Sequence, residues 1–180
     1  MVATGLINDI AYGQLSITKA KTAVLGQILF LALALIVPMI THRMGLGFLV
    51  AQPMHWMILF AGLAYGPVSG AMMGLSVPVA SFLLTGMPLP AVLPLMLPEL
   101  ALYGFLAGLL KRRLTAFGSV AVALVVGRLA FLALTVAITG LEGSVLGFVQ
   151  ATWGPGLVAV ALQIAALPVL AGLYVNWVKK

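Results

Sequence analysis

The sequence predicts an all-α integral membrane protein, a compact bundle of six transmembrane helices with both termini in the cytoplasm. Three observations predict this fold. Of the 180 residues, 63% are hydrophobic and 7% are charged. Apolar stretches close to the roughly 20 residues that a spanning helix requires follow one another, separated by short polar or Gly/Pro breaks. Lys and Arg are confined to the flanks of these stretches, so the net charge of +6 indicates orientation in a lipid bilayer and not a nucleic-acid-binding face.

Breaks in the hydrophobic pattern define the six spans. A polar triplet, residues 41–43, ends the first, and Gly66-Pro67 separates the second from the third. Residues 86–90 and the basic triplet 111–113 bound the fourth. The predicted spans are Lys21 to Ile40, Leu46 to Gly66, Pro67 to Thr85, Ala91 to Leu110, Gly118 to Thr139 and Gly154 to Val178. They make one domain, residues 1–180, in which residues 1–18 are an amphipathic or flexible N-terminal segment without the pattern of a signal peptide.

Flanking charges predict the direction of the spans. Short cytoplasmic loops are enriched in Lys and Arg. Along a six-span path, Arg43 and Glu142 fall on one side of the membrane. Seven basic residues fall on the other side, which is therefore the cytoplasmic side: Lys19, Lys21, Lys111, Arg112, Arg113, Lys179 and Lys180.

Several kinds of chemistry have no signal in this sequence. Cysteine is absent, which excludes disulfides, thiolate catalysis and Cys-based metal sites. No phosphate-binding loop of the Gly-x-x-x-x-Gly-Lys-Ser/Thr kind occurs. Two histidines and three acidic residues do not form a recognisable metal-ligand spacing. We therefore expect no cofactor and no metal.

Two charged residues within the apolar spans indicate where function resides. Glu99 lies in the fourth predicted span and Arg128 in the fifth. A charge near the bilayer centre costs on the order of 3 kcal/mol, so such side chains face a bundle interior, a partner or a polar ligand. One interpretation is a structural ion pair between the two spans. The other is a ligand-binding cavity, in which Arg128 holds a carboxylate or phosphate and Glu99 accepts hydrogen bonds from a heterocycle or amine.

Four further residues are candidates for the same site. His55 and Trp56, near the outer start of the second span, offer an imidazole and a stacking surface, although Trp56 also suits an interfacial anchor. Gln163 is expected at a depth similar to that of Glu99, and its alternative role is a hydrogen bond between helices. Tyr103 follows Glu99 by four residues and therefore lies on the same helix face, where it can equally bond to backbone.

Glycines mark predicted close packing and predicted loops. Gly62, Gly66, Gly70 and Gly74 recur every four residues, a spacing at which membrane helices approach closely. Two outer segments, the one containing Gly45 and Gly47 and the one containing Gly86, Met87 and Pro88, are candidate gates or ordinary connections.

Part of the sequence resembles a known family. The block consists of Pro53-Met54-His55, residues 62–67, Gly70, Gly74, residues 84–88 and residues 98–104. It resembles the substrate-binding S component of energy-coupling factor (ECF) vitamin transporters, in the branch with the riboflavin-type components. The resemblance implies a six-helix bundle in a prokaryotic cytoplasmic (inner) membrane that captures a small water-soluble nutrient from outside. It also implies partners, namely a transmembrane coupling subunit and two cytoplasmic ATPases.

The same resemblance implies a coupling surface on the first helix, formed by an Ala-x-x-x-Ala motif. Here Gly26 is followed four positions later by Phe30, which departs from that motif. Two other functions stay open. An intramembrane serine hydrolase would use Ser69, Ser76 or Ser81 with His55, and a channel-forming or structural protein would use the small-residue interfaces.

Overall fold

Helices occupy nearly all of the chain that the structure, a computed structural model, describes, namely residues 17–43, 52–140 and 144–179. These residues form seven α-helices and one 3-10 helix, and no strand. In chain order the elements are α2 (Ile17–Arg43), α3 (Pro53–Tyr65), α4 (Pro67–Thr85), α5 (Leu93–Leu110), α6 (Ala116–Thr139), α7 (Val145–Trp153), η1 (Gly154–Gly156) and α8 (Leu157–Lys179). The predicted all-α class is therefore confirmed for the described part of the chain.

Four helices, α4, α5, α6 and α8, are long and apolar enough to cross a membrane. They match the last four predicted spans within three residues at each end. α5 begins at Leu93 and not at Ala91, α6 at Ala116 and not at Gly118, and α8 at Leu157 and not at Gly154. α2 has 27 residues, and the apolar stretch among its described side chains is Leu25–Val37. These lengths and compositions indicate a membrane-embedded helical protein.

α3 is shorter than the predicted second span, Leu46 to Gly66. Its 13 residues extend over about 20 Å, less than the thickness of a bilayer's hydrocarbon core. The predicted start, residues 46–51, lies outside the described residues. Pro53 opens α3 at a position where the missing N–H breaks no helical hydrogen bond. α3 packs against α2, α4, α5 and α8, and residues 58–65 are all buried, so this short helix lies at the centre of the bundle.

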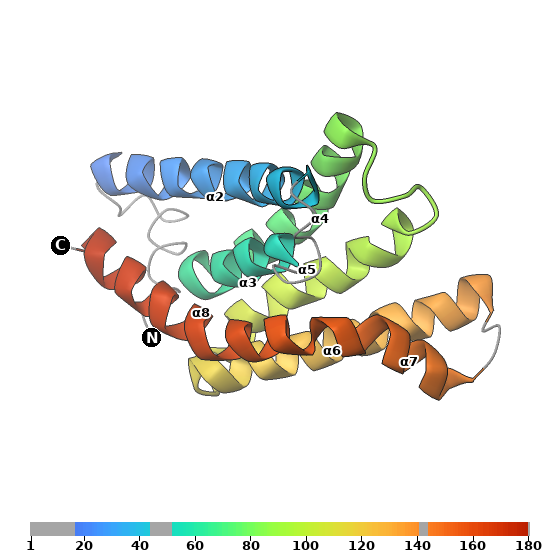
Figure 1. The fold of residues 1–180 in the computed structure, drawn as a ribbon. Coiled ribbons are helices and arrows are strands. Elements are labelled where there is room, and N and C mark those ends of the chain that lie inside the picture. Colours follow the sequence, from blue (N-terminus) through green and yellow to red (C-terminus); the bar gives the residue numbers. More distant parts are fainter. Residues whose placement is uncertain (1–16, 44–51, 141–143, 180) are drawn as a thin grey trace.

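A further short helix, α7, is absent from the six predicted spans. Ser144 caps its start, because the Ser144 hydroxyl accepts a hydrogen bond of 3.0 Å from the Gly147 N–H. Nine residues are too few to cross a bilayer. The 3-10 helix η1 then leads directly into α8, so α7 precedes that longer helix at the right end of the bundle (Figure 1).

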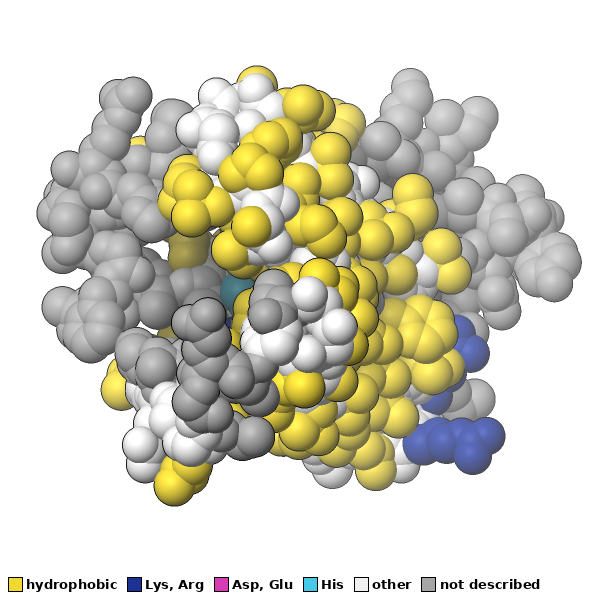
Figure 2. All heavy atoms as spheres, turned by 90° about the vertical axis from the view of Figure 1, so that its right-hand side faces the viewer, with side chains coloured by type: hydrophobic (Ala, Val, Ile, Leu, Met, Phe, Trp, Pro, Cys, Tyr) yellow, Lys and Arg dark blue, Asp and Glu magenta, His cyan; other side chains and the backbone are white. Residues whose placement is uncertain are grey.

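The bundle has two ends that differ in the connections they carry (Figure 1). The start of α2, the end of α8 and the turn between α5 and α6 lie at the left end in this view. The turn between α4 and α5, the end of α6 and the start of α7 lie at the right end. Figure 2 looks onto the right end and shows hydrophobic side chains over much of the described surface that is visible.

Glycines bring α3 and α4 into backbone contact with α5. A Cβ atom added at Gly62 or at Gly70 would overlap the backbone carbonyl of Gly104. A Cβ added at Gly74 would overlap the carbonyl of Leu100, one turn away. Backbones this close gain dispersion and weak Cα hydrogen bonds, which are the main attractions between helices in lipid.

Two other glycines of the predicted packing set have different surroundings: Gly66 lies at a helix end and Gly26 lies under side chains. Gly66 joins α3 to α4 with a φ of 102°, which side-chain-bearing residues rarely adopt. Gly26 of α2 lies directly under the hydroxyl groups of Tyr65 and Tyr174, which share a hydrogen bond. The absence of a side chain at Gly26 thus allows α2 to pack against the Tyr65–Tyr174 pair of α3 and α8.

Candidate functional site

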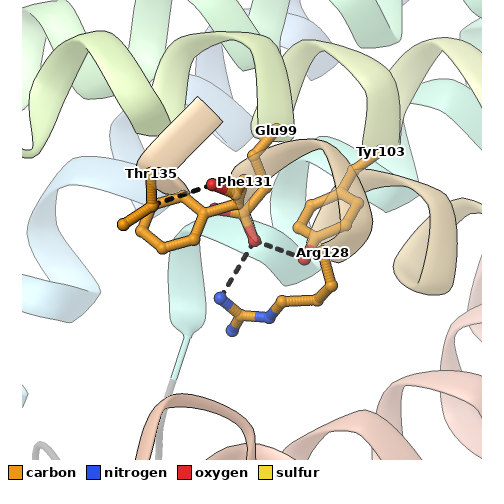
Figure 3. Close-up of polar contacts among 5 residues, drawn as sticks. All are labelled: Glu99, Tyr103, Arg128, Phe131 and Thr135. Atoms are coloured by element: carbon orange, nitrogen blue, oxygen red, sulfur yellow. Dashed lines mark hydrogen bonds and ion pairs between the residues drawn. The ribbon is translucent and has the colours of Figure 1, made fainter. Parts of the chain in front are cut away.

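A carboxylate and a guanidinium meet inside the bundle (Figure 3). Glu99 lies on α5, Arg128 lies on α6, and Arg128 Nη1 is 3.0 Å from Glu99 Oε1. The side chain of Glu99 is 2% exposed and that of Arg128 is 16% exposed. Each charge offsets the other among apolar helices, where an isolated charge would cost on the order of 3 kcal/mol. The ion pair that the sequence left as one of two alternatives is therefore present.

Tyr103 joins this pair from the next turn of α5. Its hydroxyl donates a hydrogen bond of 2.6 Å to Glu99 Oε1, the same oxygen that Arg128 contacts (Figure 3). The four-residue spacing of Glu99 and Tyr103 places both on the buried face of α5. Gly127 makes room for the phenol, because a Cβ atom at that position would overlap the Tyr103 ring. The carboxylate thus accepts from a cation and from a neutral donor at once.

His55 brings α3 to the same site. The centroid of its imidazole ring lies 5.1 Å from that of Tyr103, and the residue is 6% exposed. Neither imidazole nitrogen has a hydrogen-bond partner among the described residues. A buried polar group without a partner costs about 1–3 kcal/mol, so these nitrogens suit a polar group from outside the described residues.

Gln163 and Trp56 occupy different surroundings. Gln163 is completely buried on α8, and neither atom of its amide has a partner among the residues that the structure describes. It shares a buried stripe with Leu167 and Ala171, at four-residue spacing. Trp56 is partly buried and packs on the apolar core. The structure therefore brings Glu99, Arg128, Tyr103 and His55 together, buries the Gln163 amide on α8 without a described hydrogen-bond partner, and gives Trp56 a packing contact.

The structure describes only one of the two candidate gating segments. Gly45 and Gly47 lie outside the described residues. Gly86 ends α4 with a φ of 74°, and its N–H donates to a carbonyl of the last turn. Met87 is exposed and Pro88 is half-buried in the turn that leads toward α5. This turn lies at the right end of the bundle, the end that Figure 2 faces.

A cavity of about 240 Å³ lies between α6 and α8, and Arg128 lines it. Leu124 of α6 and Val160 of α8 contribute to its apolar wall. Two further lining residues carry polar atoms, the carbonyl oxygen of the Gln52 amide and the indole nitrogen of Trp153. Both atoms are buried and have no partner in the described part of the chain. Arg128 therefore pairs with Glu99 through its guanidinium and is also one of the residues that line this cavity.

In the part of the chain that the structure describes, the side chains are not arranged for serine hydrolysis or for metal binding. Since neither nitrogen of His55 has a partner among the described residues, no hydrogen bond links it to Ser69, Ser76 or Ser81. Ser69 instead accepts a hydrogen bond of 3.4 Å from Gln27. Within the described ranges, no three His, Cys, Asp or Glu side chains are grouped to hold a metal ion.

Three residues of the site were not predicted from the sequence. Gly127 accommodates Tyr103, while Gln52 and Trp153 line the cavity. Gln52 precedes Pro53 and Trp153 precedes a Gly-Pro-Gly turn, and both positions are local signals for a helix boundary. Neither signal tells which side chain faces inward, because that depends on how α3, α6 and α8 are rotated against one another.

Comparisons with known proteins assign no family to the chain. No protein-family model, no curated protein and no solved structure matches it. An interpretation of the site depends on its geometry and on the resemblance drawn from the sequence.

Proposed function

We propose that this chain is the substrate-capture subunit of an ATP-dependent uptake transporter. It binds a small water-soluble vitamin or a related heterocyclic nutrient from outside the cell. It then delivers that nutrient through a separate transmembrane coupling subunit, with energy from two cytoplasmic ATPases of an ECF complex. The chain's own contribution is binding, and hydrolysis of ATP belongs to the partners.

One observation carries the proposal. The Glu99–Arg128 pair is buried among helices, shares its carboxylate with Tyr103, and lies beside a cavity. Ionisable residues inside membrane helices are costly and are retained mainly where a ligand, ion or partner uses them. The unpartnered nitrogens of His55 add hydrogen-bonding capacity that no described residue uses. A largely apolar pocket with a few convergent polar groups is the usual form of a small-molecule site.

The proposal includes six spans with both termini in the cytoplasm. α2 and α3, the latter together with the residues before it, would supply the first two spans. The ends of the bundle support this orientation, because the start of α2, the end of α8 and the α5–α6 turn lie together (Figure 1). That turn carries Lys111, Arg112 and Arg113, and cytoplasmic loops are enriched in such residues. The cavity and the α4–α5 turn would then face the exterior of a prokaryotic cytoplasmic membrane.

Transport assays test this function directly. Vesicles that contain the chain together with the coupling subunit and ATPases should accumulate nutrient only when ATP is present. Native mass spectrometry of the gently purified chain would identify the nutrient, because a tightly held molecule co-purifies. Equal accumulation by the isolated chain without ATP would contradict the proposal.

A matched pair of variants connects transport to the site. Arg128→Met removes the guanidinium that pairs with Glu99, at a residue that lines the cavity, whereas Leu129→Met changes the next residue, which is 50% exposed on the surface of α6. We expect the first to abolish saturable nutrient binding and the second to leave it unchanged. Equal nutrient binding by both variants would show that the buried Glu99–Arg128 pair is not part of the binding site.

A further inference from the structure

The cavity between α6 and α8 is lined almost entirely by apolar surface, although Arg128 is among the lining residues. The two helices lie side by side in the bundle (Figure 1). Leu124 and Val125 of α6 line the space from one side, and Val160 and Ile164 of α8 line it from the other. A cavity with such a lining holds water poorly and suits an apolar occupant.

Small residues at a helix break leave this space open. The 3-10 helix η1 joins α7 to α8, and its Gly156 lines the cavity without a side chain. Around Gly154, the first residue of η1, a Cβ atom would meet open space. Ala121 of α6, another lining residue, carries only a methyl group. The cavity therefore follows from the residues at these positions.

The lining residues of α6 lie in the middle part of a helix long enough to cross a membrane. At 1.5 Å per residue, Ala121 is about 8 Å and Arg128 about 18 Å from the start of α6 at Ala116. The whole helix is about 36 Å long, and the hydrocarbon core of a bilayer is about 30 Å thick. In a membrane the cavity therefore lies at the level of the acyl chains.

Two of the lining residues also reach the outer surface of the bundle. Val125 of α6 is 54% exposed and Leu157 of α8 is 60% exposed. Their neighbours Val126 and Val158 are exposed and apolar as well. Apolar side chains exposed at this depth contact lipid tails, which are as apolar as they are. The mouth of the cavity therefore lies on a lipid-facing surface.

The size of the cavity selects a narrow occupant. Its volume is about 240 Å³, and its lining residues on α6 extend over about 10 Å. A helix of another protein, about 10–12 Å wide, is too wide to enter. A polar molecule would lose its hydration without gaining partners along the apolar walls. A single hydrocarbon chain is narrow enough, and it supplies the dispersion contacts that the lining side chains otherwise lack.

We propose that the cavity binds one acyl chain of a membrane phospholipid. The chain enters sideways between Val125 and Leu157 and packs against Leu124, Val160 and Ile164, while the headgroup stays at the membrane surface. This inference goes beyond the proposed function, because its ligand is a lipid of the surrounding bilayer and not the transported nutrient. It requires only that α6 and α8 cross the membrane.

A photoreactive phospholipid tests the proposal. The probe is phosphatidylglycerol with a diazirine in the middle of one acyl chain, mixed into nanodiscs that hold the purified full-length chain. After irradiation, peptide mass spectrometry locates the labelled residues. Leu124 lines the cavity and is only 3% exposed, whereas Val120, one turn away, is completely buried and does not line it. Because labelling requires contact, we expect at least about 5-fold more label on Leu124 than on Val120.

A matched pair of variants connects the label to the cavity. Ala121→Phe fills the space, whereas Val122→Phe places the same ring at the next position, which is exposed and does not line it. The first should lower the labelling of Leu124 about 5-fold or more, and the second should leave it unchanged. Thermal unfolding followed by circular dichroism shows whether both variants fold. If Ala121→Phe does not fold, Val160→Phe fills the cavity from α8 for the same measurement.

Each other outcome overturns the inference. Label on the exposed Val126 without label on Leu124 would show that lipid stays outside the cavity. Equal label on Leu124 and Val120, or label on Leu124 that a filled cavity does not reduce, would show that the chain reaches Leu124 by another route. Labelling of Leu124 by photoreactive free palmitate but not by the phospholipid would show a fatty-acid site. None of these outcomes depends on ATP-driven nutrient uptake, which tests the proposed function separately.

Discussion

Removal of one member of the Glu99–Arg128 pair should destabilise the protein more than removal of both. Glu99→Gln leaves the Arg128 guanidinium without its carboxylate, and Arg128→Met leaves the carboxylate without its guanidinium. Because the two side chains are only 2% and 16% exposed, solvent compensates little. Breaking a buried ion pair in this way costs about 3–5 kcal/mol. Each single variant should therefore lose about that much free energy of unfolding.

The double variant Glu99→Gln/Arg128→Met should lose much less. It carries no unpaired charge, Met fills the space of the Arg side chain, and the Gln amide oxygen can still accept the Tyr103 hydroxyl. Replacing a buried pair by uncharged groups of similar volume is often neutral, so we expect a loss within about 2 kcal/mol of the wild-type value.

Equilibrium unfolding in mixed micelles, followed by circular dichroism, measures all four proteins on one scale. Leu129→Met serves as the control, because that lipid-facing neighbour of Arg128 should change stability by no more than about 0.5 kcal/mol. If the losses of the two single variants simply add in the double variant, the pair is not coupled and the reasoning is wrong.

Three further perturbations test other parts of the structure. Gly104→Ala should lower the unfolding free energy by about 1–3 kcal/mol, because the new Cβ would overlap the backbone of α4. Gly172→Ala has open space around it and should raise the unfolding free energy by about 0.5–1 kcal/mol. Equal effects of the two variants in thermal unfolding would contradict the close approach of α4 and α5. His55→Phe keeps an aromatic ring at this position and removes two unpartnered nitrogens, so the unfolding free energy should be kept or raised while nutrient uptake falls. Unchanged uptake would show that His55 takes no part in nutrient binding. Tyr174→Phe deletes the hydrogen bond with Tyr65 and should lower unfolding free energy by about 0.5–1.5 kcal/mol in chemical denaturation, and no loss would mean that the bond contributes nothing.

Local signals in the sequence predict the helices well where a break is unambiguous. α4 runs from Pro67 to Thr85, as predicted, because Gly66 and Gly86 both adopt positive φ angles that end a helix. α7 was missed because its nine residues are too few to cross a bilayer and fall between the fifth and sixth predicted spans. A search for membrane-spanning stretches does not detect so short a helix, whereas the Ser144 cap and the turn at η1 mark its two ends.

The site could be predicted only along single helices. The four-residue spacing of Glu99 and Tyr103 fixes their common face, and the structure places both at the same carboxylate oxygen. The partner on α6 was one of two alternatives, since spacing along one helix says nothing of the neighbour's rotation. Gln52 and Trp153 come from helix ends that tertiary packing brings together, so no sequence pattern links them.

The glycine contacts have a mechanical consequence. Where Gly62, Gly70 and Gly104 meet, main chain lies directly on main chain, with no side chains between them to change rotamer and absorb a shift. Sliding or tilting α5 against α3 and α4 would force the carbonyls into one another, so these three helices move as a single stiff body. An opening that moves whole helices must then displace α2, α6, α7 or α8 around that body, and spin labels on α6 and α8 would record it.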